Sequence, residues 1–148
     1  MNYLVGIGLA CALCFSALGS AFGAGIASQG AIGGWKKCYM QSKAAPFTMV
    51  AFSGAPLTQT IYGYLLSTFI SSSAASGAVS KTPMLGLAVG VFAGMAIGFS
   101  AFFQGKAAAA ACDSLAETGK GTANYFIVVG IIETVALFTL ILGMLLLQ

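Results

Sequence analysis

Four long apolar stretches, separated by three short polar ones, make up almost the whole chain. Each is longer than the ~20 residues that a helix, rising about 1.5 Å per residue, needs to cross a hydrocarbon core of ~30 Å. A backbone that crosses lipid must satisfy its own hydrogen bonds, so we expect every stretch to be helical. The predicted spans are residues 3–34, 47–70, 84–111 and 122–147.

The two halves of the chain resemble each other, which predicts a duplicated hairpin. Residues 20–25 (SAFGAG) align with 100–105 (SAFFQG), and 58–60 (TQT) align with 132–134 (IET). Both hairpins would start on the same side of the membrane, so the repeat is parallel. The expected fold is an all-α membrane protein with four transmembrane helices in two tandem hairpins. We expect a first hairpin over residues 1–72, an outside link over 73–83 and a second hairpin over 84–148.

Composition supports a membrane protein and excludes several other classes. Only 6% of the 148 residues are charged, whereas soluble domains carry about 25%. The absence of His excludes a His-based metal centre or catalytic triad. Six scattered Lys form no basic stripe for nucleic acid. The Gly105-Lys106-Ala107 sequence lacks the remaining residues of a phosphate-binding loop, so we expect no nucleotide site.

Lysine placement predicts the orientation. The positive-inside rule puts Lys-rich links in the cytoplasm. The first and third breaks are rich in Lys and the second holds only Lys81, so both termini should face outward. No basic residue precedes the first apolar stretch, which we therefore expect to be a retained helix and not a signal peptide. The links predicted to be cytoplasmic are residues 35–46 and 112–121; the Lys on that side are Lys36, Lys37, Lys43, Lys106 and Lys120.

Small residues recur every fourth position in the first and third stretches, a pattern that lets helix backbones approach closely. Two such helices per chain indicate a tightly packed inner layer. The spacing fits both ordinary pairing within one four-helix bundle and a ring of many copies. The residues are Gly19, Gly23, Ala27 and Ala31 in the first stretch and Gly86, Gly90, Gly94 and Gly98 in the third.

Glu133 is the most informative residue, because it lies near the middle of the last apolar stretch with no Lys within a turn. An ionised carboxylate at membrane depth costs several kcal/mol, so such a residue is protonated, binds a cation or meets an external positive group. The pattern therefore predicts an ion or proton site. The alternative is a protonated Glu that serves only helix packing.

Neutral polar side chains in the other stretches could complete that site. Thr58 and Tyr62 share one helix face, Gln59 is adjacent, and Pro56 frees a backbone carbonyl one turn back. The third stretch adds Gln104. Hard cations bind several oxygen ligands, whereas a proton needs only the carboxylate, so this excess of oxygens favours Na⁺. Alternatively, these side chains serve only to hold the helices together through interhelical hydrogen bonds.

Asp113 and Glu117 lie four residues apart, in or near a polar link. They fit either a solvated helix face or a surface on which a soluble partner docks.

With these features in place, the chain resembles the proteolipid rotor subunits, called K or c, of bacterial V-type ATPases of the Na⁺-translocating type. The resemblance covers essentially the whole length. In that family one carboxylate serves four helices, and Gln59 stands opposite Glu133 in the repeat. The segments that carry the resemblance are the duplicated hairpin, the glycine-rich stretches, residues 56–63 (PLTQTIYG), residues 102–109 (FFQGKAAA) and residues 132–134 (IET).

The resemblance implies a homo-oligomeric ring that rotates against a stator membrane subunit with an essential Arg. Central-stalk subunits would contact the cytoplasmic links, and lipid would surround the ring. It implies no catalysis or ATP binding by this chain alone, and a bacterial plasma membrane location. It also implies that Tyr62 hydrogen-bonds the Glu133 carboxylate. The Na⁺ ligands implied are Glu133, Gln104, Thr58, Gln59 and the backbone carbonyl of Ala55, where the family has Leu.

Two other functions stay open at this point. The same rotor could carry H⁺ on Glu133 in place of Na⁺. A self-contained secondary transporter or channel would also place a carboxylate at membrane depth, with Glu133 as a gating proton site. A purely structural membrane protein would leave Glu133 unexplained.

Overall fold

The computed structural model describes residues 2–79 and 82–148, and every regular element in that part is a helix. The all-α class predicted from the apolar stretches is therefore confirmed. Lys81, which contributed to the predicted orientation, lies outside the described residues. The elements are α1 (Tyr3–Met40), α2 (Met49–Gly54), the 3-10 helix η1 (Ala55–Leu57), α3 (Thr58–Ser76), α4 (Pro83–Thr118) and α5 (Thr122–Leu146).

Three of these helices, α1, α4 and α5, are long and apolar enough to cross a membrane. With 38 and 36 residues, α1 and α4 are about 57 Å and 54 Å long, so they extend well past a hydrocarbon core of ~30 Å. The shorter α3 has 19 residues and is rich in Ser and Thr. A fourth span, and with it the layout of two tandem hairpins, remains a prediction.

Three helices continue further than expected, and one of them is α3, which runs to Ser76 where the predicted span ended at residue 70. We predicted links at residues 35–46 and 112–121, but α1 runs through Lys36 and Lys37 to Met40, and α4 runs through Glu117 to Thr118. Charged residues interrupt an apolar stretch without ending a helix, because Lys and Glu are good helix formers. α4 stops where Gly119 adopts a left-handed conformation (φ 64°), a common helix terminator.

The helical path between residues 49 and 76 is divided by a proline. Pro56 has no backbone N–H to donate, and the chain narrows to a 3-10 turn at Ala55–Leu57 before α3 begins. This turn brings the carbonyl of Ala55 next to the first side chain of α3. It thereby separates α2 from α3 at the level of the polar residues that begin α3.

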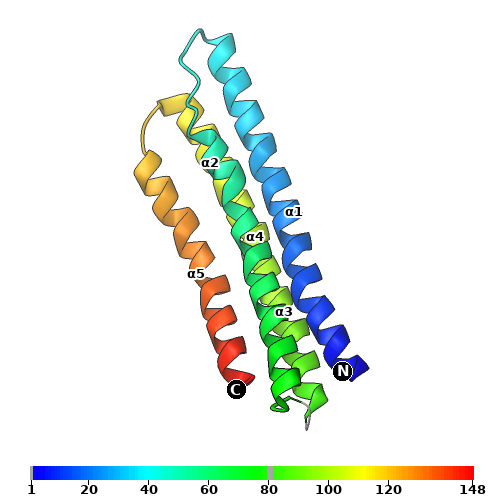
Figure 1. Ribbon diagram of the computed structural model, residues 1–148. Coiled ribbons are helices and arrows are strands. Elements are labelled where there is room, and N and C mark those ends of the chain that lie inside the picture. Colours follow the sequence, from blue (N-terminus) through cyan, green and yellow to red (C-terminus); the bar gives the residue numbers. More distant parts are fainter. Residues whose placement is uncertain (1, 80–81) are drawn as a thin grey trace.

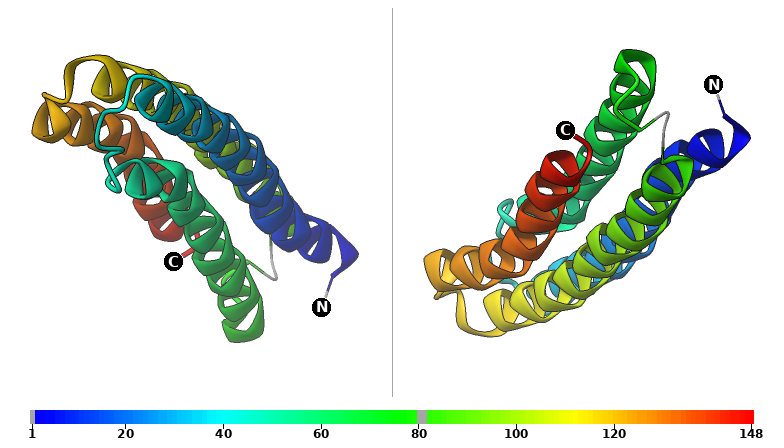
Figure 2. Two further views of the ribbon diagram at one scale, coloured as in Figure 1. Left: turned by 90° about the horizontal axis from the view of Figure 1, so that it is seen from above. Right: turned by 90° about the horizontal axis from the view of Figure 1, so that it is seen from below.

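The helices form two layers. Figure 1 shows the ends of α3 and α5 and the starts of α1 and α4 at one end of the molecule, with the α1–α2 and α4–α5 links at the other. Figure 2 shows α1 running beside α4, while α3 and α5 lie together on the opposite side. The contacts agree, because α1 packs mainly on α4, and α3 packs on α1, α4 and α5.

Glycines permit very close packing between α1 and α4. A Cβ added at Gly98 would meet the Phe15 backbone, and one at Gly105 would collide with Gly23. Gly19 lies against Gly98, and Gly23 against Ala101. The small residues of the two predicted series are therefore mostly at this contact. In α4, the glycines that face α1 are Gly90, Gly94 and Gly98. In α1, the buried members of the series include Ala27 and Ala31. The exception is Gly86, where an added Cβ would first meet the Val79 side chain.

Candidate ion-binding site

Glu133 lies near the middle of α5, half-buried, and its carboxylate accepts two hydrogen bonds from other helices. The Tyr62 hydroxyl of α3 donates to Oε1 at 2.7 Å. The Gln104 amide of α4 donates to Oε2 at 3.3 Å. The carboxylate is thus held between α3 and α4.

Side chains of α4 also bond the backbone of α5 close to this carboxylate. Gln104 Nε2 donates to the Val129 carbonyl at 3.1 Å, and Ser100 Oγ donates to the Ile132 carbonyl at 2.8 Å. Both carbonyls lie within about one turn of Glu133. These two bonds fix the register of α5 on α4, and therefore the depth at which Glu133 lies.

A pair of fully buried glutamines connects the carboxylate to α3. The Gln59 amide donates to Gln104 Oε1 at 2.8 Å, and both side chains are 0% exposed. Gln104 thus accepts from Gln59 and donates to Glu133 and Val129. This pair couples the beginning of α3 to the carboxylate of α5.

The start of α3 holds three oxygens close together, of which the Ala55 carbonyl also accepts the backbone N–H of Thr58. Thr58 Oγ1 lies 3.1 Å from the Ala55 carbonyl oxygen and 3.1 Å from Gln59 Oε1. A hydroxyl carries a single hydrogen and can donate fully to only one acceptor at a time. The 3-10 turn at Pro56 aims the Ala55 carbonyl at Thr58. The result is a corner of three neutral oxygens at the start of α3.

The structure brings all six predicted site residues into one hydrogen-bonded network. From η1 to α5 the members are Ala55, Thr58, Gln59, Tyr62, Gln104 and Glu133. The sequence analysis missed Ser100 and the carbonyls of Val129 and Ile132. The position of Ser100, one helical turn before Gln104 on the same face, is the signal that could have found it.

The charge balance of this network restricts what it could bind. Across residues 2–79 and 82–148, no group of three or more His, Cys, Asp or Glu could hold a metal ion. The ion pairs of that part of the chain do not involve Glu133. One carboxylate among neutral oxygens balances a single positive charge. The network therefore suits a monovalent cation or a proton better than a divalent metal.

Comparison with known proteins matches part of the chain to a family. Residues 87–146 match the family model of the ATP synthase c-subunit. The matched segment covers most of α4 and all of α5, including Gln104 and Glu133. No curated protein matches the chain.

The match supports the c-subunit, or proteolipid, family, whose members are non-catalytic subunits of ion-translocating enzymes and form oligomeric rings. Together with the three apolar helices it indicates an integral membrane protein. The matched segment does not extend to α3, which supplies Thr58, Gln59 and Tyr62.

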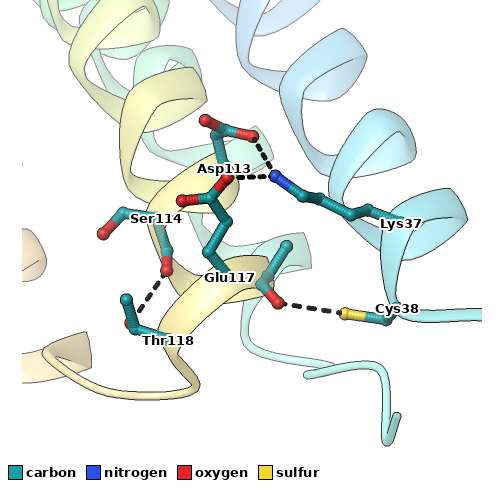
Figure 3. A network of polar contacts seen from close by, with 7 residues as sticks. Lys37, Cys38, Asp113, Ser114, Glu117 and Thr118 are labelled. Atoms are coloured by element: carbon teal, nitrogen blue, oxygen red, sulfur yellow. Dashed lines mark hydrogen bonds and ion pairs between the residues drawn. The ribbon is translucent and has the colours of Figure 1, made fainter. Parts of the chain in front are cut away.

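A second polar network joins α1 to α4 at the end of the molecule that holds the α1–α2 and α4–α5 links, here called the link end (Figure 3). It lies beyond the apolar part of each helix. Lys37 bridges Asp113, at 3.8 Å, and Glu117. Its hydrogen bond with Glu117 lowers the pKa of the Glu117 carboxyl and raises the pKa of the Lys37 ammonium. Asp113 and Glu117, for which either a solvated face or a docking surface was expected, are thus paired with α1 and remain exposed.

Proposed function

We propose that this chain is the rotor ring subunit of a V-type ATPase and carries Na⁺ across the membrane on Glu133. The observation that carries the proposal is the arrangement of one carboxylate in the same network as a corner of three neutral oxygens. A proton carrier needs the carboxylate alone. The shared hydrogen among Ala55, Thr58 and Gln59 favours a cation, which would draw on all three oxygens at once.

In this proposal the cation is held by oxygens of several helices. The Ala55 carbonyl, Thr58 Oγ1 and Gln59 Oε1 approach it from one side. Gln104 Oε1 and the Glu133 carboxylate bind the cation from the other side. The Tyr62 hydroxyl keeps its hydrogen bond to the carboxylate and holds it in position. The bound cation neutralises Glu133.

Neutralisation is what lets the site face lipid. Beside Glu133, α5 exposes an apolar surface that includes Ile131, Val135 and Phe138. An ionised carboxylate on such a surface is costly, whereas the neutral ion-loaded site can cross it. A stator subunit with an essential Arg would load the ion through one half-channel and help to displace it into another after nearly a full turn.

Other subunits would supply the energy. Moving one charge against 100 mV requires about 2.3 kcal/mol, and ATP hydrolysis elsewhere in the complex would provide the torque. The exposed link end, with Lys37, Asp113 and Glu117, would contact the central stalk. This chain would carry out no catalysis itself.

ATP-driven Na⁺ uptake into vesicles that contain the whole complex tests the proposal with Glu133→Gln. The variant removes the charge and keeps the shape, so we expect ring assembly and no coupled uptake. The matched control is Thr134→Val, which removes a neighbouring hydroxyl that bonds only the Ile131 carbonyl of its own helix and should keep uptake. Uptake by the Glu133→Gln complex at the rate of the unaltered one would contradict the proposal.

H⁺ is the second candidate for the carried ion. It is favoured by the closed network itself, in which Glu133 already accepts from Tyr62 and Gln104 without any cation ligand. In that case Thr58 and Gln59 would serve only to hold the helices together. The Na⁺ dependence of uptake separates the two, because an H⁺ rotor would work equally well in K⁺ alone.

A further inference from the structure

Ser20 of α1 is the one buried side chain in the described residues whose polar atom has no hydrogen-bond partner. It is 1% exposed. Ser16, one turn earlier on the same face, is also buried, but its hydroxyl donates to the Ala12 carbonyl at 2.8 Å. Buried polar atoms are nearly always paired, so an unpaired hydroxyl in a close-packed layer calls for a specific explanation.

The helix register places Ser20 level with Gln59. α1 and α3 run antiparallel, and two close approaches fix how they align. A Cβ at Gly63 would meet the Ser16 side chain, and a Cβ at Gly23 would lie 3.0 Å from Pro56 Cβ. One turn forward from Ser16 on α1 corresponds to one turn back from Gly63 on α3. That step leads from Ser16 to Ser20 and from Gly63 to Gln59.

The Gln59 amide needs a second acceptor if the site binds a cation. In the hydrogen-bonded network, Gln59 Nε2 donates to Gln104 Oε1. The proposed function turns Gln104 Oε1 toward the cation as a ligand. That oxygen would then share its lone pairs between the cation and Gln59 Nε2, which would weaken the hydrogen bond of an amide that remains fully buried.

We propose that Ser20 Oγ is the acceptor that receives the Gln59 amide when the cation takes Gln104 Oε1. α1, which otherwise supplies no residue of the ion site, thereby supplies a positioning residue. It acts through Gln59 by holding that amide so that Oε1 stays turned toward the cation. The inference rests on the proposed function and adds to it a residue that contacts no ion.

The test is a comparison of Ser20→Ala with Ser16→Ala in the full-length protein solubilised in detergent. Carbodiimide modification of Glu133 is measured while NaCl is raised at constant ionic strength with KCl. We expect Ser20→Ala to raise the half-protecting Na⁺ concentration about tenfold, the usual order for one unmade buried hydrogen bond. Its labelling without Na⁺, and the pH profile of that labelling, should match the unaltered protein.

Ser16→Ala is the matched control, because it removes a hydroxyl that bonds backbone carbonyls of α1 and α4 and no residue of the ion site. It should leave the half-protecting concentration unchanged, even where it lowers the thermal stability. Ser20→Cys, whose thiol is a weak acceptor, should give an intermediate value and serves in place of Ser20→Ala if that variant does not fold.

The outcomes separate the two proposals. If Na⁺ protects the unaltered protein and Ser20→Ala behaves like Ser16→Ala, the role of Ser20 is overturned while the sodium site stands. If Na⁺ protects no variant, including the unaltered protein, both proposals are overturned. If Ser20→Ala changes the labelling of Glu133 without Na⁺ as much as it changes the labelling with Na⁺, the variant has a structural defect. That result would also overturn the positioning role.

Discussion

The two layers of the molecule are built in different ways. Between α1 and α4 the backbones almost touch, and glycines such as Gly23, Gly98 and Gly105 leave no room for a Cβ. Between α3 and α5 the contact is made by side chains, with Tyr62 bonded to Glu133. The ion site lies where α3 and α5 meet α4, and Gln104 of α4 bonds both Gln59 and Glu133. The close-packed α1–α4 layer thus supports the site and contributes Gln104 to it.

The largest stability difference between the layers should come from adding one methyl group. Gly98→Ala would drive a Cβ into the Phe15 backbone, and overpacking of this kind costs about 1–3 kcal/mol. Gly130→Ala of α5 meets nothing within 4 Å and gains helix propensity of up to about 1 kcal/mol. Thermal unfolding in detergent should show a lower Tm for the first and an equal or higher Tm for the second.

Equal Tm values for the two alanine variants would show that the α1–α4 contact is looser than the glycine contacts indicate. The comparison of layers would then lose its basis.

Within α3, one tyrosine bonds the site carboxylate and another, two residues later, is exposed. Tyr62→Phe removes the donor to the Glu133 carboxylate, and hydrogen bonds to charged groups contribute about 1.5–3 kcal/mol. We therefore expect Na⁺ protection of Glu133 to weaken by about tenfold or more. The control is Tyr64→Phe, because Tyr64 is 56% exposed and should leave protection unchanged. Equal effects of the two variants would mean that the phenol of Tyr62 matters only for packing.

The smallest effect on stability is expected at the link end, where the ends of α1 and α4 are exposed. Lys37 lowers the pKa of Glu117 from its ordinary 4.5, so this pair stabilises the fold above that pH and the contribution is lost as pH falls through the folded value. The raised pKa of Lys37 means that the contribution is also lost as pH rises above about 10.5. Both side chains are partly exposed, so the effect is small.

Glu117→Gln should lower the Tm slightly at pH 7, and this effect should shrink as the pH falls below 4.5. A loss of stability that is as large at pH 3 as at pH 7 would mean that the carboxylate charge is not responsible. Asp113→Asn, which removes the longer 3.8 Å pair, should have a still smaller effect.

Much of this arrangement follows from sequence pattern alone. The helical class follows from apolar length, and Glu133 stands out because a carboxylate is rare and costly at membrane depth. The helix ends near Lys37 and Glu117 do not follow, since charge ends an apolar run without ending a helix. The 3-10 turn at Pro56 is a local consequence of a missing N–H, but its effect on the Ala55 carbonyl requires the backbone path.

The finer parts of the site depend on how the helices align. Ser100 and Gln104 bond α5 only because α4 and α5 have one particular register. Likewise, nothing in the sequence around Ser20 distinguishes it from Ser16. Their difference arises from the antiparallel packing of α1 on α3, which no single-helix pattern contains.

The most direct test of the central claim is carbodiimide modification of Glu133 in the unaltered protein, across pH, with Na⁺ or K⁺ at equal ionic strength. The oxygen corner at Ala55, Thr58 and Gln59 predicts that millimolar Na⁺ protects Glu133 and K⁺ does not. Thr58→Val should abolish most of that protection and leave labelling without Na⁺ intact. Protection that follows pH alone, with no difference between Na⁺ and K⁺, would contradict the sodium site.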